Sequence, residues 1–280
     1  MKLSVIIPVY NAADTLERCV RSVSCQSFAD WEMILVDDGS SDGSGEMADT
    51  LAREDCRIKT VHRQNGGVSA ARNTGLMWAD GDCVMFVDSD DEISADTLAP
   101  LMRLMESHPE VDMLEFPSCM RYGHPSSQRF VPPCKIWDSS SDYWHETEGW
   151  EHAYVWNKVF RAKVFDGLLF PKGRIFEDLW VCSEMMANGA KVMTTDKGMY
   201  IYHWNGNGLS SSADGSALEQ LLETQMRAAK LMHTTPWKRN GWKLYRSMLC
   251  RQVDVYRLTG KLMLRFPLVK TICKIHMLCR

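Results

Sequence analysis

Short apolar runs alternate with stretches of helical periodicity along the first 116 residues of the chain. Strands are predicted over residues 3–9, 33–36, 58–62, 84–87 and 111–116, and those over 3–9 and 84–87 are expected to be buried. Helices are predicted between them, over residues 13–25, 42–53, 68–79 and 95–107. Strands that alternate with helices at this spacing indicate βαβ units and a mostly parallel central sheet with flanking helices. The chain is therefore expected to be an α/β protein.

The pattern changes after residue 116. Residues 117–149 lose periodicity and are rich in Pro, Ser, His and aromatic residues, which predicts an irregular insertion or a small antiparallel addition. A helix over 177–188 and a strand over 191–195 resume the earlier pattern, and the chain is predicted to be helical from residue 216 onward.

This pattern predicts two domains, which differ in charge. We expect an α/β domain over residues 1–212, with halves 1–116 and 117–212, and a helical extension over 213–280. Residues 230–280 carry 12 Lys and Arg but a single acid, whereas the rest of the chain is acidic. A uniform nucleic-acid binder does not have this asymmetry, so no nucleic-acid partner is expected.

Residues 237–280 combine two amphipathic helical patterns with eleven basic residues and with Trp237, Trp242 and Phe266. This composition suits a helix at the surface of an anionic membrane. It suits equally a helical cap that packs on the rest of the chain with a solvated basic face. Both interpretations stay open on the sequence alone.

Several features bear on where the chain works. Its ten cysteines form no CxxC pair, which predicts reduced, mostly buried thiols of a cytosolic protein. The first apolar run is broken by Pro8 and is too short for a signal peptide, and no stretch approaches the ~20 apolar residues that span a bilayer. We expect a cytoplasmic protein, at the inner face of the membrane if the basic tail contacts lipid.

Polar residues follow three of the predicted strands. Pro8-Val9-Tyr10-Asn11 ends the first, Asp37-Asp38 ends the second, and Asp88-Ser89-Asp90-Asp91 follows the fourth. Ligands of parallel α/β sheets bind outside the carboxyl ends of the strands. The three segments therefore predict one binding site.

The segment Asp88-Ser89-Asp90-Asp91 is the strongest chemical signal. Three acids after a buried strand are costly unless they are solvated or bind a cation. Mg²⁺ and Mn²⁺ prefer oxygen ligands, and Mg²⁺ typically takes one or two carboxylates plus substrate phosphates. The alternative is that Asp90 to Glu92 cap the helix predicted over 95–107, where acids suit the helix dipole.

The other segments suit a nucleotide. A carboxylate at Asp37-Asp38 can accept a hydrogen bond from a base N–H, and Tyr10 can stack on a flat base. Each could instead be an ordinary turn. Gly66-Gly67 leads into a helix of small residues that permits close packing or approach of phosphate. On that helix, Arg72 either faces the nucleotide or pairs with an acid.

Four segments in this order resemble the family 2 glycosyltransferases, which have the GT-A fold. They are Val-Ile-Ile-Pro-Val-Tyr-Asn, Val-Asp-Asp-Gly-Ser-Ser-Asp, Gly-Gly-Val-Ser-Ala-Ala-Arg-Asn-Thr-Gly and Val-Asp-Ser-Asp-Asp. The resemblance covers about residues 2–120 and 150–212. It implies that the chain inverts the anomeric carbon as it moves a sugar from a nucleotide sugar, by default a UDP-sugar, to an acceptor hydroxyl. It also implies a Mn²⁺ or Mg²⁺ cofactor, and a glycan or lipid-linked glycan acceptor in the biosynthesis of a surface polysaccharide such as capsule, exopolysaccharide or O-antigen.

The resemblance further implies residue roles in the first half of the chain. Tyr10 matches the base-stacking residue, Asp38 the residue that reads the base, and Arg72 a nucleotide-contacting arginine. Asp88 matches the acid on the ribose and metal side, and Asp90 the direct metal ligand. The expected nucleotide-sugar site thus comprises Pro8, Tyr10, Asn11, Asp37, Asp38, Arg72, Asp88 and Ser89.

In the second half, the resemblance points to the acceptor side. Asp178 matches the catalytic base, and the like charge of Glu177 would raise its basicity; the alternative is that both are ordinary acids at a helix start. Trp156 and Lys158 lie in a segment that shapes the acceptor side in relatives. His203 opens a loop that closes over the diphosphate in relatives, and it is a candidate metal or phosphate contact.

Two other classes of protein fit parts of the sequence. A nucleotidyltransferase also uses metal-binding acids on an α/β sheet, but it normally has a Gly-rich basic loop where this chain has Asn11-Ala12-Ala13-Asp14. A non-catalytic sugar- or lipid-binding module would keep the fold without turnover, which the intact acids Asp88, Asp90 and Asp178 argue against.

Overall fold

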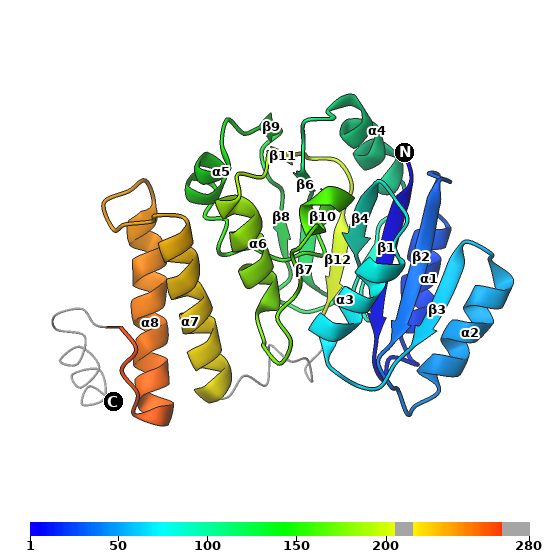
Figure 1. Cartoon of the computed structure of the whole chain (residues 1–280), viewed down its shortest axis with the longest axis horizontal. Helices are drawn as coiled ribbons and strands as arrows, with labels where there is room; N and C mark the ends of the chain where they lie inside the picture. Colours follow the sequence, from blue (N-terminus) through cyan, green and yellow to red (C-terminus); the bar gives the residue numbers. More distant parts are fainter. Residues whose placement is uncertain (205–214, 265–280) are drawn as a thin grey trace. The chain divides into compact units, whose positions relative to one another are not determined.

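The computed structural model describes residues 1–204 and 215–264 (Figure 1). The chain divides into two compact units, each built from several stretches. The first unit comprises residues 1–139, 154–173 and 190–204, and the second comprises 140–153, 174–189 and the chain from 205 onward.

The first unit contains an eight-stranded sheet in the order β3-β2-β1-β4-β10-β6-β11-β9. Its strands are β1 (Leu3–Val9), β2 (Trp31–Asp37), β3 (Ile58–His62), β4 (Cys83–Phe86), β6 (Met113–Glu115), β9 (Lys135–Ile136), β10 (Lys158–Arg161) and β11 (Val192–Thr194). The four strands β3, β2, β1 and β4 are parallel, whereas β10 runs antiparallel to both of its neighbours. The predicted mostly parallel α/β sheet is confirmed.

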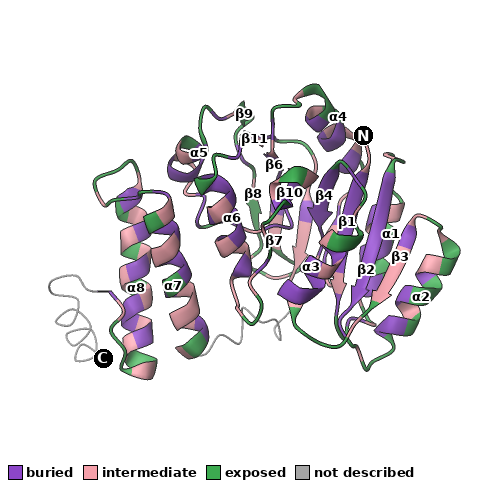
Figure 2. Cartoon of the chain, in the orientation of Figure 1, coloured by how far each residue is buried: buried purple, intermediate pink, exposed green. Residues whose placement is uncertain are grey.

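The two faces of this sheet are covered by different helices. The helices are α1 (Leu16–Ser24), α2 (Ser44–Glu54), α3 (Val68–Trp78) and α4 (Leu98–Ser107). Leu3, Val5, Ile7 and Val9 of β1 join one core with apolar residues of α1, α2 and α4. Helix α3 packs on Ile6, which points to the other face, and it approaches so closely that a Cβ on Gly75 would lie 2.3 Å from the Ile6 side chain. Because both faces are covered, β1 and β2 are buried along almost their whole length (Figure 2).

A second, four-stranded sheet has the order β5-β12-β7-β8. Its strands are β5 (Glu92–Ile93), β7 (Ser118–Tyr122), β8 (Gln128–Phe130) and β12 (Tyr200–His203). The β7–β8 pair is the antiparallel addition that the sequence left open for residues 117–149. Strand β12 is parallel to β7 and antiparallel to β5, so it joins the segment after β4 to the rest of this sheet.

The second unit is helical where it is described. It contains α5 (Ser140–Glu146), α6 (Glu177–Ala187), α7 (Gly215–Leu231) and α8 (Gly241–Thr259). Trp180 of α6 packs against the guanidinium groups of Arg174 and Arg227, which pair with Glu223 and Glu184. The helices predicted from residue 216 are confirmed as far as residue 259, and the rest of the basic tail lies outside the described residues.

The sequence predicts no membrane-spanning helix and mostly buried thiols, and the described residues bear on both expectations. No helix there is long and apolar enough to cross a membrane. Eight cysteines are described and all are free thiols, but only Cys19, Cys83 and Cys182 are buried. The expectation of mostly buried thiols is therefore wrong, because Cys25, Cys56, Cys134 and Cys250 lie on the surface.

Candidate active site

The candidate site lies at the carboxyl ends of β2, β1 and β4, three neighbouring parallel strands. Backbone hydrogen bonds hold these ends together: Asp38 N–H donates to Val9, and Val87 N–H donates to Ile6. Beyond the end of β1, the Tyr10 side chain is 55% exposed. Its aromatic ring is therefore available to a flat ligand.

The loops after β1 and β2 are tied to each other. Asn11, which adopts a positive φ of 49°, accepts a hydrogen bond from Ser41 N–H through its side chain, and its own N–H donates to the Ser40 hydroxyl. Asp42 accepts a hydrogen bond from Ala13 N–H. The sequence-predicted residues Tyr10 and Asn11 are therefore held beside the Asp37-Asp38 segment.

Asp37 stabilises the loop that follows β2. Its carboxylate accepts a hydrogen bond from Ser40 N–H and lies 2.9 Å from Nδ1 of His62. Burial alone would raise the pKa of Asp37, but the hydrogen bonds of Ser40 and His62 outweigh burial and hold this pKa below its usual range. In turn, the hydrogen bonds to Asp37 and Asp49 raise the pKa of His62.

Asp38 is more deeply buried, at 3% exposed. Its carboxylate pairs with Arg63 and accepts hydrogen bonds from the backbone N–H groups of Gly66 and Gly67. Three protein donors thus converge on Asp38. The contacts fix the glycine turn that leads into α3.

The segment after β4 carries the acids Asp88 and Asp90. Asp88, 27% exposed, accepts a hydrogen bond of 2.9 Å from Arg72, which is 3% exposed. Of the two alternatives for Arg72, the structure thus shows pairing with an acid. Arg18 of α1 donates to the backbone carbonyl of Asp90. Helix α4 begins at Leu98, well beyond these acids, so the helix-cap interpretation of the segment is wrong.

Asp91, directly after Asp90, points into the protein. It is fully buried and accepts hydrogen bonds from the Tyr200 hydroxyl (2.9 Å) and from His203 N–H (2.8 Å). Burial, followed by the negative charges of Asp88 and Asp90, raises the pKa of Asp91 well above its ordinary value. A negative charge on Asp91 is therefore unfavourable in its buried position beside Asp88 and Asp90.

A divalent cation fits this donor set. Asp88 and Asp90 offer oxygen ligands only, as Mg²⁺ and Mn²⁺ prefer. Within residues 1–204 and 215–264, no three His, Cys, Asp or Glu side chains gather closely enough to hold a metal. Two carboxylates completed by substrate phosphates match the usual Mg²⁺ pattern. His203 is engaged elsewhere, since its Nε2 lies 2.9 Å from Glu92.

The residues expected on the acceptor side of the first unit are buried. Lys158 is 1% exposed and donates to Glu115 and Asn157 inside the sheet. Trp156 is 4% exposed and stacks on Tyr154 and Tyr200. Both side chains are enclosed by neighbouring side chains, so they can shape the acceptor side only from beneath the surface, and this role stays a prediction.

Glu177 and Asp178 begin α6 in the second unit. The residue before them, Phe176, has φ 63° and ψ 34°, a left-handed conformation that is uncommon for a bulky residue. Such backbone strain clusters at functional sites. Glu177 is 7% exposed and Asp178 is less enclosed. Acids in a first helical turn also suit the helix dipole, so both interpretations of the pair remain.

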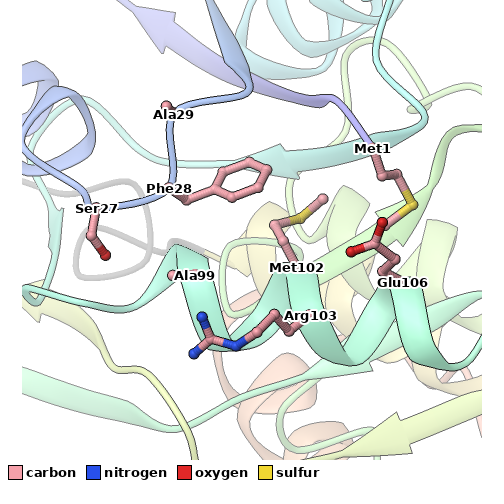
Figure 3. A pocket seen from close by; sticks show the side chains of 8 residues that line it. All are labelled: Met1, Ser27, Phe28, Ala29, Ala99, Met102, Arg103 and Glu106. Carbon is pink, nitrogen blue, oxygen red and sulfur yellow. The ribbon is translucent and has the colours of Figure 1, made fainter.

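Two hollows in the first unit differ in their relation to this site. A cleft of about 220 Å³ is lined by Met1, Phe28, Met102, Arg103 and Glu106, with its apolar side chains between α4 and the segment before β2 (Figure 3). Met1 precedes β1, so this cleft lies at the opposite end of the strands. An open groove of about 590 Å³, lined by Arg18 and Glu92 among others, borders the Asp88–Asp91 turn.

Known proteins agree with this arrangement. The family model described as "Glycosyl transferase family 2" matches residues 4–148, more than half of the chain. The chain belongs to this family. An uncharacterised glycosyltransferase of the same kind, EpsJ of Bacillus subtilis, is 35% identical over 81% of this chain and 68% of its own length. Glycosyltransferase GlyA of Streptococcus pneumoniae is 31% identical over 75% of this chain, which spans only 31% of GlyA.

Solved structures share the GT-A fold of the family. S. aureus TarS (1–349), crystallised with UDP-GlcNAc, superposes with a TM-score of 0.70 at 23% identity and covers 99% of this chain and 79% of TarS. A mannosyltransferase from Pyrobaculum calidifontis, in complex with GDP-Man and Mn²⁺, superposes with a TM-score of 0.63 at 17% identity, covering 99% and 79% of the two chains. At these identities the likeness establishes the fold.

Several residues around the site were not foreseen from the sequence. Arg63 follows β3, so the strand-end rule that selected Tyr10, Asp38 and Asp88 could also have selected it. Arg18 lies on the helix after β1, and nothing in the sequence relates it to Asp90. Tyr200 lies 109 residues from its partner Asp91, and only the fold brings them together.

Proposed function

We propose that this chain moves a sugar from a nucleotide-sugar donor, with UDP as the expected nucleotide, to a hydroxyl of a glycan or lipid-linked glycan. The observation that carries the proposal is the meeting of exposed Tyr10, Asp38 and the Asp88–Asp90 acids at three adjacent strand ends. Membership of family 2 supports sugar transfer. The UDP-GlcNAc bound by TarS supports UDP, and GDP is the competing choice because the mannosyltransferase binds GDP-Man.

On the donor side, Tyr10 stacks on the base, with Pro8 and Asn11 shaping its loop. Asp38, supported by Asp37, reads the base, and its position is fixed by Arg63. Arg72 orients Asp88, with Ser89 beside it. Asp88 and Asp90 would hold Mn²⁺ or Mg²⁺, and the cation would supply positive charge that neutralises the leaving diphosphate.

On the acceptor side, Asp178 is the proposed general base. It takes the proton of the acceptor hydroxyl while that oxygen attacks the anomeric carbon from the face opposite the diphosphate. The bond from this carbon to the diphosphate oxygen breaks, and the anomeric configuration inverts. Glu177, a like charge next in sequence, raises the basicity of Asp178.

We further propose that the acceptor belongs to surface polysaccharide biosynthesis at the inner face of the membrane. In the described part of the basic tail, Trp237 is 93% exposed and Trp242 is 51% exposed. Trp beside basic residues is typical of interfacial segments. Cosedimentation with anionic vesicles tests this contact: Trp237→Ala should weaken binding, while the equally bulky, exposed Trp78→Ala in the first unit should not. Equal binding by all three proteins would disprove this contact.

The donor proposal is tested by a thermal-shift panel of UDP-, GDP- and dTDP-sugars, each with Mn²⁺ and with EDTA. A ligand that binds only the folded state raises Tm. A shift with one nucleotide that disappears in EDTA is the expected result. If no nucleotide sugar shifts Tm under either condition, the chain is instead a non-catalytic binding module.

A further inference from the structure

The Tyr200 hydroxyl occupies a position that the proposed chemistry does not explain. Tyr200 is 0% exposed, in the middle of the fold, yet its hydroxyl connects two points of the Asp88–Asp91 turn. It accepts a hydrogen bond from Asp88 N–H (3.1 Å) and donates one to the Asp91 carboxylate (2.9 Å). One buried oxygen therefore fixes the backbone before the turn and the side chain after it.

The other end of β12 holds the same segment. His203 N–H donates to the second oxygen of Asp91 (2.8 Å), and the His203 ring lies 2.9 Å from Glu92. Backbone pairing of Tyr200 with Ile93 and of Ile201 with Glu92 continues the attachment. The turn is thus anchored to β12 at both of its ends.

The ring of Tyr200 is anchored independently of its hydroxyl. It stacks on Trp156, with ring centroids 4.5 Å apart, and Trp156 also stacks on Tyr154 at 4.6 Å. A phenylalanine would keep this stacking and most of the buried area. The hydroxyl can therefore be removed with little change to the packing.

Asp88 and Asp90 lie two residues apart and repel each other, and this repulsion favours opening of the turn when no cation is bound. We propose that Tyr200, acting through Asp91, is a positioning residue that holds Asp88 and Asp90 at the spacing a divalent cation requires. Groups that orient metal ligands in this way typically contribute ten- to hundredfold to metal affinity. The inference goes beyond the proposed function and rests on it only for the binding measurement.

The decisive variant is Tyr200→Phe, with Tyr202→Phe as its matched control. Tyr202 lies on the same strand and stacks on the same Trp156, but its hydroxyl hydrogen-bonds nothing in the described chain. Mn²⁺ binding in the presence of UDP, or of GDP if UDP does not bind, is followed by electron paramagnetic resonance. We expect Tyr200→Phe to weaken Mn²⁺ binding about tenfold or more, and to lower Tm by a few degrees because Asp88 N–H and Asp91 lose a buried hydrogen-bond partner. Tyr202→Phe should bind Mn²⁺ as the wild type does.

A double-mutant cycle with Asp91→Asn separates positioning from simple packing. If the hydroxyl acts through Asp91, the two substitutions together weaken Mn²⁺ binding no more than Asp91→Asn alone. Wild-type affinity in Tyr200→Phe, or fully additive losses, would overturn the proposal.

Amide hydrogen exchange of the metal-free protein gives a test that needs no ligand. Residues 88–93 should exchange faster in Tyr200→Phe than in the wild type or in Tyr202→Phe. Unchanged exchange would overturn the inference. If the wild-type chain binds no nucleotide with Mn²⁺, the proposed function fails, and this measurement alone decides the role of Tyr200.

Discussion

Asp38 and Asp88 both follow buried parallel strands, but their surroundings differ. Asp38 is almost fully buried and receives hydrogen bonds from Arg63, Gly66 and Gly67. Asp88 is about a quarter exposed, pairs with Arg72, and lies in a turn with two more acids. The charge of Asp38 is balanced by three hydrogen-bond donors. Asp88 has Arg72 as a partner but lies close in sequence to two further acids.

The two carboxylates are therefore suited to different roles, one to stabilising a loop and the other to binding a cation. A buried carboxylate with three donors stabilises its loop, because removing it leaves those donors unsatisfied. Acids that repel each other lower the free energy of unfolding, and a bound cation relieves this repulsion. Substitutions in the two segments should therefore differ most clearly in their effect on stability.

The two largest expected effects are on activity. Asp90→Asn should lower sugar transfer by about 10²–10³-fold or more, because the cation loses an anionic ligand. Radiolabelled sugar transfer and Mn²⁺-dependent donor binding measure it. Near-normal activity would remove Asp90 from the metal site.

Asp178→Asn tests an acid outside both segments. We expect unchanged donor affinity but a kcat lowered about 10²–10⁴-fold, since a general base acts on the acceptor alone. Single-turnover transfer and calorimetric donor binding separate the two quantities. Weakened donor binding with normal transfer per bound donor would show that Asp178 is not the base.

Stability should discriminate between Asp38 and Asp90. Asp38→Asn should lower the free energy of unfolding by about 2–3 kcal/mol, because Arg63 and two backbone N–H groups lose a charged acceptor. Asp90→Asn should leave it unchanged or raise it by up to about 1 kcal/mol as repulsion is relieved. Urea unfolding without metal measures both. An equal loss in the two variants would contradict the comparison.

The smallest expected effect is a pH dependence around Asp37. The raised pKa of His62 means that protonated His62 stabilises the fold fully below the unfolded pKa of about 6.5, and that this stability is lost as pH rises through the folded pKa. His62 is half exposed, so the contribution is at most about 1 kcal/mol. The stability difference between wild type and His62→Asn should shrink from pH 5.5 to pH 9. A constant difference across that range would be inconsistent with a charged His62–Asp37 pair.

The sequence predicts the strands of the sheet better than it predicts the hydrogen-bond partners of the site residues. Strand β1 has the predicted bounds, because a nearly continuous apolar run marks a strand covered on both faces. Strand β3 also has the predicted bounds, although only its first residue, Ile58, is buried. Helix α4 begins at Leu98 and not at the predicted residue 95, because residues 95–96 form a turn that follows β5. Strands β10 and β12 were not predicted as strands, because each is four residues long and is defined by partners distant in sequence.

For the site, strand ends identified Tyr10, Asp38 and Asp88, but not their partners. The sequence left open whether Arg72 faces a ligand or an acid, and only the packing of α3 on the sheet decides this. The role of Tyr200 depends on the register between β12 and β5, which no local pattern encodes.

The strand order β3-β2-β1-β4 has a consequence of its own. The chain winds from β1 outward through α1 and α2 on one face, then returns through α3 on the other face to reach β4. The helix that follows β1 and the helix that precedes β4 therefore lie on opposite faces of the sheet. The strand order reverses between β1 and β4, which makes this position a topological switch point. The position of the candidate site is thus set by the strand order rather than by any one side chain. If the proposed function holds, substitutions in the loops after β1 and β4 change which sugar nucleotide binds without moving the site.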